Sequence, residues 1–103
     1  MAATRDDIIR LLRSHEAELR AAGIVSLSLF GSVARNEKEA HDVDIAVRLS
    51  PSFSKLGFDY FGRLEDLERR LSSILSCPVD VVEEPVRKPQ FQLEIDRDRT
   101  VAF

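Results

Sequence analysis

Apolar and polar residues alternate along two stretches of the chain, residues 24–30 and 42–49. Such alternation places neighbouring side chains on opposite faces of a β-strand. In the first stretch Val25, Leu27 and Leu29 alternate with two serines, and in the second the apolar residues alternate with two aspartates, an alanine and an arginine. We therefore expect two strands of one sheet, with one apolar face covered by helices and one face of small and acidic groups.

Apolar residues recur at helical spacing in two further stretches. The first begins at Thr4, which forms a capping-box pattern with Asp7, and is expected to run as one helix to a stop at Gly23. The second begins near Phe58 and ends before Pro78, because proline cannot continue a helix. The residues expected on the two apolar stripes are Ile8, Leu12, Leu19 and Ala22, and then Phe61, Leu64, Leu67, Leu71 and Ile74.

Beyond the second strand the local patterns are shorter. Residues 50–57 contain Pro, Ser and Gly and are expected to form a loop. Residues 79–83 form a third apolar run that Asp80 interrupts, and on local pattern alone this carboxylate fits a turn or edge position as well as a catalytic one. Residues 90–95 alternate as a strand would, whereas Pro89 suits the first turn of a helix.

Three isolated polar residues are expected to have packing roles. His15 falls on the apolar stripe of the first helix, and Tyr60 lies near the start of the second. Cys77 has no charged neighbour in sequence that would activate its thiol, so we expect an inert core residue. As the only cysteine, it also excludes an internal disulfide and a cysteine-rich zinc site.

Composition indicates one soluble globular domain, residues 1–103, with a core of modest size. The apolar fraction is 44% and the charged fraction 32%, as in ordinary globular proteins. A net charge of −3 argues against long-range attraction to nucleic acid, so direct nucleic-acid binding is not expected. No apolar run approaches the ~18 residues of a membrane span and no signal peptide is evident, so a cytoplasmic location is expected.

The candidate chemistry lies between the first two strands. Asp42 and Asp44 are two residues apart on a strand, so their carboxylates point to the same face and repel each other. A divalent cation relieves that repulsion, and carboxylate oxygens suit Mg²⁺. Upstream, Gly31 permits a tight turn and close approach of a ligand, and Ser32 stands where a helix N-terminus offers N–H groups to a phosphate. The arrangement predicts a site for a metal-bound nucleoside triphosphate.

The same residues resemble a known family. The sequence GSVAR at residues 31–35, followed by DVD at residues 42–44, is similar to the signature of the DNA polymerase beta-like nucleotidyltransferases. The GSVAR run resembles in particular the minimal nucleotidyltransferases, the MNT or MntA group, which pair with HEPN-domain toxins. Asn36 stands where the family commonly has glycine, and asparagine also tolerates left-handed backbone angles. His41 stands where a serine is common, and neither departure removes a metal ligand.

The resemblance covers essentially the whole chain and implies a fold. The fold class expected is α+β, with a small mixed β-sheet of about four strands and helices packed on one face. The family's pattern favours a helix near residues 89–97 and a short last strand at 100–103. It also places a third carboxylate on a later strand, and Asp80 fits that position, which favours the catalytic interpretation of this residue.

The resemblance further implies roles for the site residues. Arg35 either neutralises phosphate charge or locks the turn through a salt bridge, and both roles remain open. The expected catalytic and metal-binding residues are Asp42, Asp44 and Asp80, and the expected nucleotide-binding residues are Gly31, Ser32 and Arg35. Two Mg²⁺ ions and ATP are the expected cofactor and substrate.

The reaction implied by the family is transfer of a nucleoside monophosphate with release of pyrophosphate. In proteins of the MNT group the acceptor is a tyrosine hydroxyl of a HEPN RNase toxin. The resemblance thus implies an antitoxin that adenylylates its toxin, within a hetero-oligomer. Two alternatives remain open: a binding-only antitoxin with an idle site, and a free-standing nucleotidyltransferase that acts on a small molecule.

Overall fold

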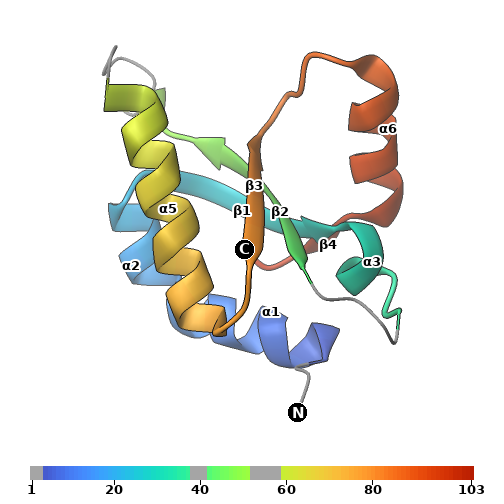
Figure 1. Ribbon diagram of the computed structural model, residues 1–103, viewed down its shortest axis with the longest axis horizontal. Coiled ribbons are helices and arrows are strands. Elements are labelled where there is room, and N and C mark those ends of the chain that lie inside the picture. The colour runs from blue at the N-terminus through green and yellow to red at the C-terminus, as the bar shows by residue number, and fades with distance from the viewer. Residues whose placement is uncertain (1–3, 38–41, 52–58) are drawn as a thin grey trace.

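The computed structural model describes residues 4–37, 42–51 and 59–103 and contains a four-stranded mixed sheet with helices (Figure 1). The elements are α1 (Arg5–Ser14), α2 (Glu16–Ala21), β1 (Ile24–Phe30), α3 (Gly31–Ala34), β2 (Val43–Leu49), α5 (Asp59–Leu75), β3 (Val79–Glu83), α6 (Pro89–Asp98) and β4 (Thr100–Val101). The predicted α+β fold class is confirmed, as are the helix and last strand of the C-terminal segment. His41, Phe58 and most of the predicted loop at 50–57 lie outside the described residues.

The sheet has the strand order β3-β2-β1-β4. β1 pairs antiparallel with both β2 and β4, whereas β2 pairs in parallel with β3. In the parallel pair Asp44 lies directly opposite Asp80. No helix of the described residues is long and apolar enough to span a membrane.

The larger core lies between one face of the sheet and the helices α1, α2 and α5. Leu12 of α1, Leu27 of β1 and Leu71 of α5 are completely shielded from solvent, and Val47 of β2 packs in the same cluster. Burial of these side chains stabilises the sheet by roughly 1.5–3 kcal/mol for each one. The predicted apolar face and its helical cover are therefore present.

The predicted alternation fails at the first residues of β1. Ile24 is buried, and Val25 is 47% exposed, so the placement of Val25 on the apolar face is wrong. The pairing of β1 with β2 shifts between Ile24 and Ser26. A β-bulge there adds one residue and reverses the face to which the preceding side chain points. From Leu27 onward the faces alternate, because Leu27 and Leu29 pack in the larger core and Phe30 packs in a separate cluster.

The N-terminal helical segment is broken, in contrast to the single helix predicted. It begins as expected, because Thr4 and Asp7 form a capping box in which each side chain accepts a backbone N–H. α1 ends just before His15, whose N–H donates to Leu12 O at 3.2 Å. This three-residue spacing tightens the last turn. His15 Nδ1 lies 2.9 Å from Glu18 Oε2 at the start of α2.

The apolar stripe of α5 begins at Tyr60, and Phe61 is not part of it. Phe61 is 74% exposed, whereas Tyr60 and Leu64 pack against the buried Leu67 and Leu71. The spacing from Tyr60 to Leu64, Leu67 and Leu71 follows one helix face, and the next residue along is turned about 100° away from it. The packing role predicted for Tyr60 is confirmed, and its phenol also donates to Glu83.

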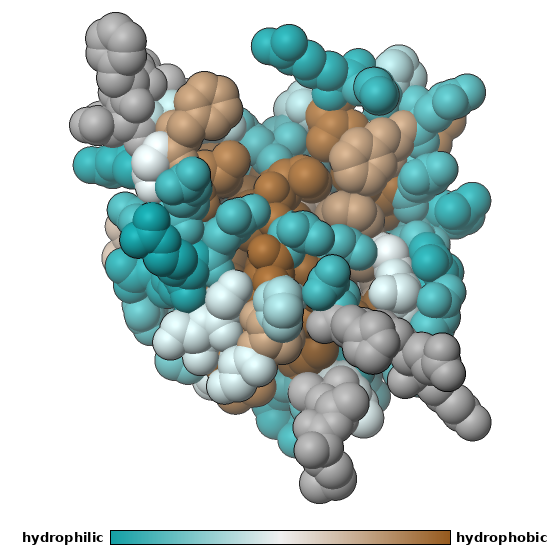
Figure 2. All heavy atoms as spheres, viewed as in Figure 1, coloured by the Kyte–Doolittle hydropathy of each residue, from teal (hydrophilic) through white to brown (hydrophobic). Residues whose placement is uncertain are grey.

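α6 covers part of the second face of the sheet, on the opposite side from α5 (Figure 1). This face was expected to carry small and acidic groups, with the helices packed on the other face. Phe30, Ala46 and Ile95 instead form a small buried cluster there, and the rings of Phe30 and Phe91 meet edge to face at 5.7 Å. Figure 2 shows apolar residues gathered between the sides on which α5 and α6 lie.

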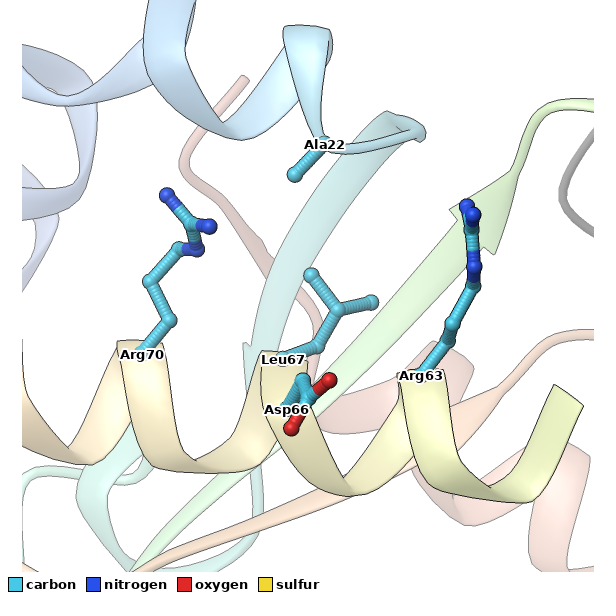
Figure 3. A pocket seen from close by; sticks show the side chains of 5 residues that line it. All are labelled: Ala22, Arg63, Asp66, Leu67 and Arg70. Carbon is cyan, nitrogen blue, oxygen red and sulfur yellow. The ribbon is translucent and has the colours of Figure 1, made fainter. Parts of the chain in front are cut away.

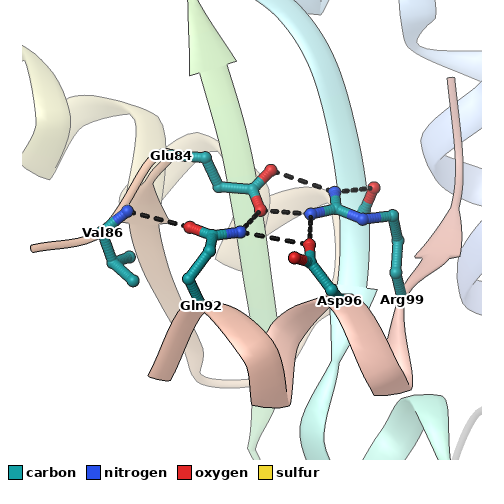
Figure 4. Close-up of polar contacts among 6 residues, drawn as sticks. Glu84, Val86, Gln92, Asp96 and Arg99 are labelled. Atoms are coloured by element: carbon teal, nitrogen blue, oxygen red, sulfur yellow. Dashed lines mark hydrogen bonds and ion pairs between the residues drawn. The ribbon is translucent and has the colours of Figure 1, made fainter. Parts of the chain in front are cut away.

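A buried ion pair fastens α6 to the strands (Figure 4). Glu84 follows β3 and is only 4% exposed, and both terminal nitrogens of Arg99 donate to its carboxylate. Arg99 also donates to Ser28 Oγ on β1 at 3.1 Å and to Asp96 at 2.8 Å, while Gln92 donates to Glu84 at 2.9 Å. The hydrogen bonds from Arg99 hold the pKa of Glu84 below its usual value.

Arg99→Ala is expected to lower the free energy of unfolding by about 3 kcal/mol, because Glu84 would keep its charge in a buried position. Denaturant unfolding at neutral pH measures this loss. Arg69→Ala is the control, since Arg69 is 75% exposed and its ion pairs with Glu65 and Asp66 lie at the surface, where removal of a pair costs below about 0.5 kcal/mol. Equal losses in the two variants would contradict the prediction.

The acid dependence of stability provides a second check on this ion pair. Because the pKa of Glu84 is lowered in the fold, the unfolded chain takes up the proton first as the pH falls. The stabilisation by Glu84 is therefore present above pH 4.5, the ordinary value, and is lost as the pH falls through the lowered pKa. The difference between wild type and Arg99→Ala should shrink on acidification.

Candidate active site

Gly31 and Asp44 are packed directly against each other at the end of β1. Phe30, the last residue of β1, pairs with Asp44 on β2, so the turn after β1 starts beside this carboxylate. A β-carbon at Gly31 would clash with Asp44 Oδ2, and the φ angle of Gly31 is +73°. Glycine alone among the amino acids adopts this region without steric cost. Both the backbone conformation and the contact with Asp44 therefore require glycine here.

Three predicted carboxylates lie at the same end of the sheet. Asp44 and Asp80 are register partners on parallel strands, so their side chains leave the same face. Asp42 lies two residues before Asp44, immediately before β2. Asp44 is half-buried, whereas Asp42 and Asp80 are exposed. The site therefore has one shielded carboxylate and two that solvent or a second molecule can reach.

The charges of this cluster act on Asp44. Burial raises the pKa of Asp44, the negative charges of Asp80 and Asp42 raise it further, and Arg35 partly opposes them. A divalent cation would relieve this repulsion, and carboxylate oxygens are the donors that Mg²⁺ prefers. The donor chemistry therefore fits Mg²⁺. Within 4–37, 42–51 and 59–103, no group of three or more His, Cys, Asp or Glu side chains is already arranged to hold a metal ion.

The turn after β1 is closed by its own backbone. Arg35 N–H donates to Gly31 O at 3.0 Å, and Glu37 N–H donates to Ser32 O at 3.0 Å. Asn36 has a φ of 61°, in the left-handed region that asparagine tolerates better than most residues. Gly31 and Ser32 thus form the first two residues of α3, beside Asp44.

Arg35 forms ion pairs on both sides of its guanidinium group. One terminal nitrogen lies 2.6 Å from Asp98 Oδ2 on α6, and Nε lies 2.9 Å from Glu37 Oε1. Of the two roles considered for Arg35, the salt bridge that locks the turn is thus present in the structure. Asp98 could not be recognised from the sequence, because no local pattern distinguishes it from other charged residues near the C-terminus.

The thiol of Cys77 has none of the features of a nucleophile. Burial raises its pKa, and the negative charge of Asp42 raises it further. The thiol is therefore kept protonated, and the Cys77 side chain packs against the larger core. This agrees with the inert role expected from the sequence.

A separate surface pocket of about 290 Å³ lies between α5 and the end of α2 (Figure 3). Its lining residues are Ala22, Arg63, Asp66, Leu67 and Arg70. Arg63 and Arg70 rise from α5 on either side of Leu67, and Arg70 is paired with Glu18 at 2.9 Å. None of the residues predicted from the sequence to form the site lines this pocket.

The sequence of residues 11–102 matches the family model described as a nucleotidyltransferase domain. The chain belongs to the nucleotidyltransferase domain family. No protein of curated function matches the sequence at a significant level. Nucleotidyltransferase domains act on a nucleotide with a divalent metal, and that general chemistry suits the carboxylates and the glycine turn described above.

Solved structures share this fold. A candidate minimal nucleotidyltransferase is 26% identical, with a TM-score of 0.69 and 95% of each chain covered. A toxin–antitoxin structure with AMP-PNP is 24% identical, with a TM-score of 0.63, and covers 98% of this chain and 73% of the other. The complex of a tri-AMPylated Shewanella oneidensis HEPN toxin with its MNT antitoxin contains a chain 22% identical, with a TM-score of 0.62 and coverage of 92% and 71%. At 24% and 22% identity the likeness concerns the fold.

Gly31→Ala is expected to destabilise the nucleotidyltransferase domain by about 1–2 kcal/mol, because a non-glycine residue is strained at positive φ and its β-carbon would displace Asp44. Gly62→Ala is the matched control. Gly62 lies on α5 with no atom within 4 Å of an added β-carbon, so alanine should stabilise by roughly 0.5–1 kcal/mol. Denaturant unfolding of both variants measures the difference, and equal effects would contradict the role assigned to Gly31.

Asp44→Asn is expected to raise the Tm by roughly 2–5 °C at neutral pH in the presence of a chelator, because one member of a repelling cluster loses its charge. A carboxylate with a raised pKa costs stability where it is ionised, and this cost disappears as the pH falls through the raised pKa. The gain should therefore vanish in acid. Asp66→Asn, on the exposed side of α5, should leave the Tm unchanged. A lower Tm for Asp44→Asn would contradict the interpretation.

Proposed function

We propose that this nucleotidyltransferase domain transfers AMP from MgATP to a tyrosine hydroxyl of a HEPN-domain toxin and is its antitoxin. The observation that carries the proposal is the placement of Gly31 against Asp44, with Asp80 in register beside it. Membership of the family supports nucleotidyl transfer. Solved structures of the same fold include complexes of toxin and antitoxin, one with an AMPylated HEPN toxin, which supports the choice of acceptor.

The carboxylates would hold the divalent ions. Asp44 would supply oxygens from β2, Asp42 from the position just before this strand, and Asp80 from the neighbouring β3. Because Asp42 and Asp80 are exposed, their side chains can turn toward an ion without movement of the strands. When bound, Mg²⁺ ions stabilise the negative charge on the attacking and leaving oxygens of phosphoryl transfer.

The exposed Asp80 is also suited to accept a proton. In the proposed reaction the tyrosine oxygen bonds to the α-phosphorus of ATP while the bond from that phosphorus to pyrophosphate breaks. The phenolic proton passes to the carboxylate of Asp80 if the two oxygens come within about 3 Å. The products are AMP-tyrosine and pyrophosphate.

The turn after β1 would hold the phosphates. The Asp44 carboxylate fills the space that a side chain at Gly31 would take, so a phosphate would bind at the N–H groups near Ser32, which point out of the start of α3. Arg35 adds positive charge beside the site while its guanidinium remains bound to Glu37 and Asp98. The three predicted nucleotide-binding residues, Gly31, Ser32 and Arg35, would therefore contribute to the site in different ways.

Incubation of the purified domain with a cognate HEPN toxin, ATP and Mg²⁺ tests the proposal. We expect the toxin to gain the mass of one or more AMP groups on a tyrosine, and the modified toxin, once separated, to remain inactive as an RNase. Asp44→Asn should lower the rate of modification by about 100-fold or more, because it removes a metal ligand and its charge. Asp66→Asn should retain the wild-type rate.

Two outcomes would contradict the proposal. Protection of cells by the Asp42→Ala, Asp44→Ala double variant at normal expression would favour a binding-only antitoxin. Transfer of AMP to a small hydroxyl compound, with the toxin left unmodified, would favour a free-standing nucleotidyltransferase.

A further inference from the structure

The ion pair between Arg35 and Asp98 is more shielded than the other ion pair of Arg35. The side chain of Asp98 is 7% exposed, whereas that of Glu37 is 52% exposed. Shielded, charge-assisted hydrogen bonds of 2.6 Å are stronger and less screened by salt than surface pairs. Asp98 is therefore the more shielded of the two carboxylates that hold the guanidinium of Arg35.

The residue after Asp98 is anchored to a different part of the site. Arg99 binds Glu84, which directly follows β3, and Ser28 in the middle of β1. Two consecutive residues at the end of α6 thus reach two separate segments: Asp98 contacts the turn of Gly31 and Ser32 through Arg35, and Arg99 contacts the end of the strand that carries Asp80.

α3 depends on such contacts for its position. It has only four residues, and a helix of one turn is not stable by itself. Two of its residues, Val33 and Ala34, are buried, and the guanidinium of Arg5 donates to Ala34 O at 3.2 Å from α1. The turn is therefore held by α1 on one side and by the Arg35–Asp98 pair from α6.

We infer that Asp98 is a positioning residue for the nucleotidyl transfer, which through Arg35 fixes the Gly31–Ser32 turn relative to the strand that carries Asp80. The inference rests on the proposed function and adds to it a residue 63 positions from Arg35 in sequence. Asp98 touches neither nucleotide nor acceptor in this scheme. Its effect is on the geometry of the turn against which the triphosphate is bound.

Positioning of the turn by Asp98 and direct phosphate binding by Arg35 lead to different expected effects when the charge of Asp98 is removed. If Arg35 binds phosphate, the Asp98 carboxylate competes with the nucleotide, and loss of its charge should strengthen binding of MgATP. If Asp98 positions the turn, loss of its charge should loosen α3 and slow the transfer, with little change in the affinity for MgATP. Separate measurement of kcat and of KM for MgATP in Asp98→Asn therefore distinguishes the two roles.

The test compares Asp98→Asn with Glu94→Gln, a matched change on an exposed residue of the same helix. For Asp98→Asn we expect amide hydrogen exchange in residues 33–36 to rise by about 10-fold, kcat to fall by about 10-fold, and KM for MgATP to change by less than about 3-fold. Asp98→Glu, which keeps the charge, should recover part of kcat. Glu94→Gln should match wild type in all three measurements.

A fall in KM for Asp98→Asn with kcat unchanged, or unchanged exchange in residues 33–36, would overturn the inference. The exchange measurement needs no substrate, and calorimetric titration with Mg²⁺ and AMP-PNP measures nucleotide affinity without transfer. If wild type binds AMP-PNP but modifies no toxin, the proposed acceptor is wrong. The exchange result still decides whether Asp98 positions the turn.

Discussion

The contact between Gly31 and the Asp44 carboxylate constrains the rest of the site. It requires a bare α-carbon at the end of β1 and a left-handed backbone angle there, and so determines where α3 begins. Because Phe30 pairs with Asp44, the contact also depends on the register of β1 with β2. A shift of that register by one residue would turn Asp44 toward the core. Burial of the apolar face therefore fixes the strand register, and this register in turn fixes the position of Asp44 on the other face.

Repulsion among the carboxylates of the site lowers the stability of the fold, and favourable interactions elsewhere in the domain offset this loss. Burial and two neighbouring carboxylates raise the pKa of Asp44, which means that its ionised form is held against repulsion. The offset comes from the larger core on one face and, on the other, from the cluster under α6 and the ion pair of Glu84 with Arg99. α6 thus contributes both to stability and, through Asp98, to the arrangement of the turn.

Local patterns predicted those features that depend on neighbours in sequence. Alternation placed Leu27 and Val47 in the core, because the period of a strand is fixed by its backbone. The same rule failed at Val25, because a bulge depends on how two strands pair and leaves no mark in either one. The motif indicated Arg35 as important, but its partner Asp98 lies on a helix distant in sequence. Ion pairs of this kind have no periodicity from which to predict them.

Asp44 and Asp80 differ in exposure, and this difference divides the site into a part that would bind metal and phosphate and a part open to the acceptor. Asp44 is half-buried and held by Gly31, so the strands and the turn fix the part of the site that would bind metal and phosphate. Asp80 is the exposed partner of Asp44 on the same face, where the acceptor hydroxyl would arrive in the proposed reaction. Which hydroxyl group comes close to Asp80 would then depend on the surface that binds the acceptor molecule. The strand register that aligns Asp44 with Asp80 is set by the pairing of β2 with β3 and does not depend on the acceptor.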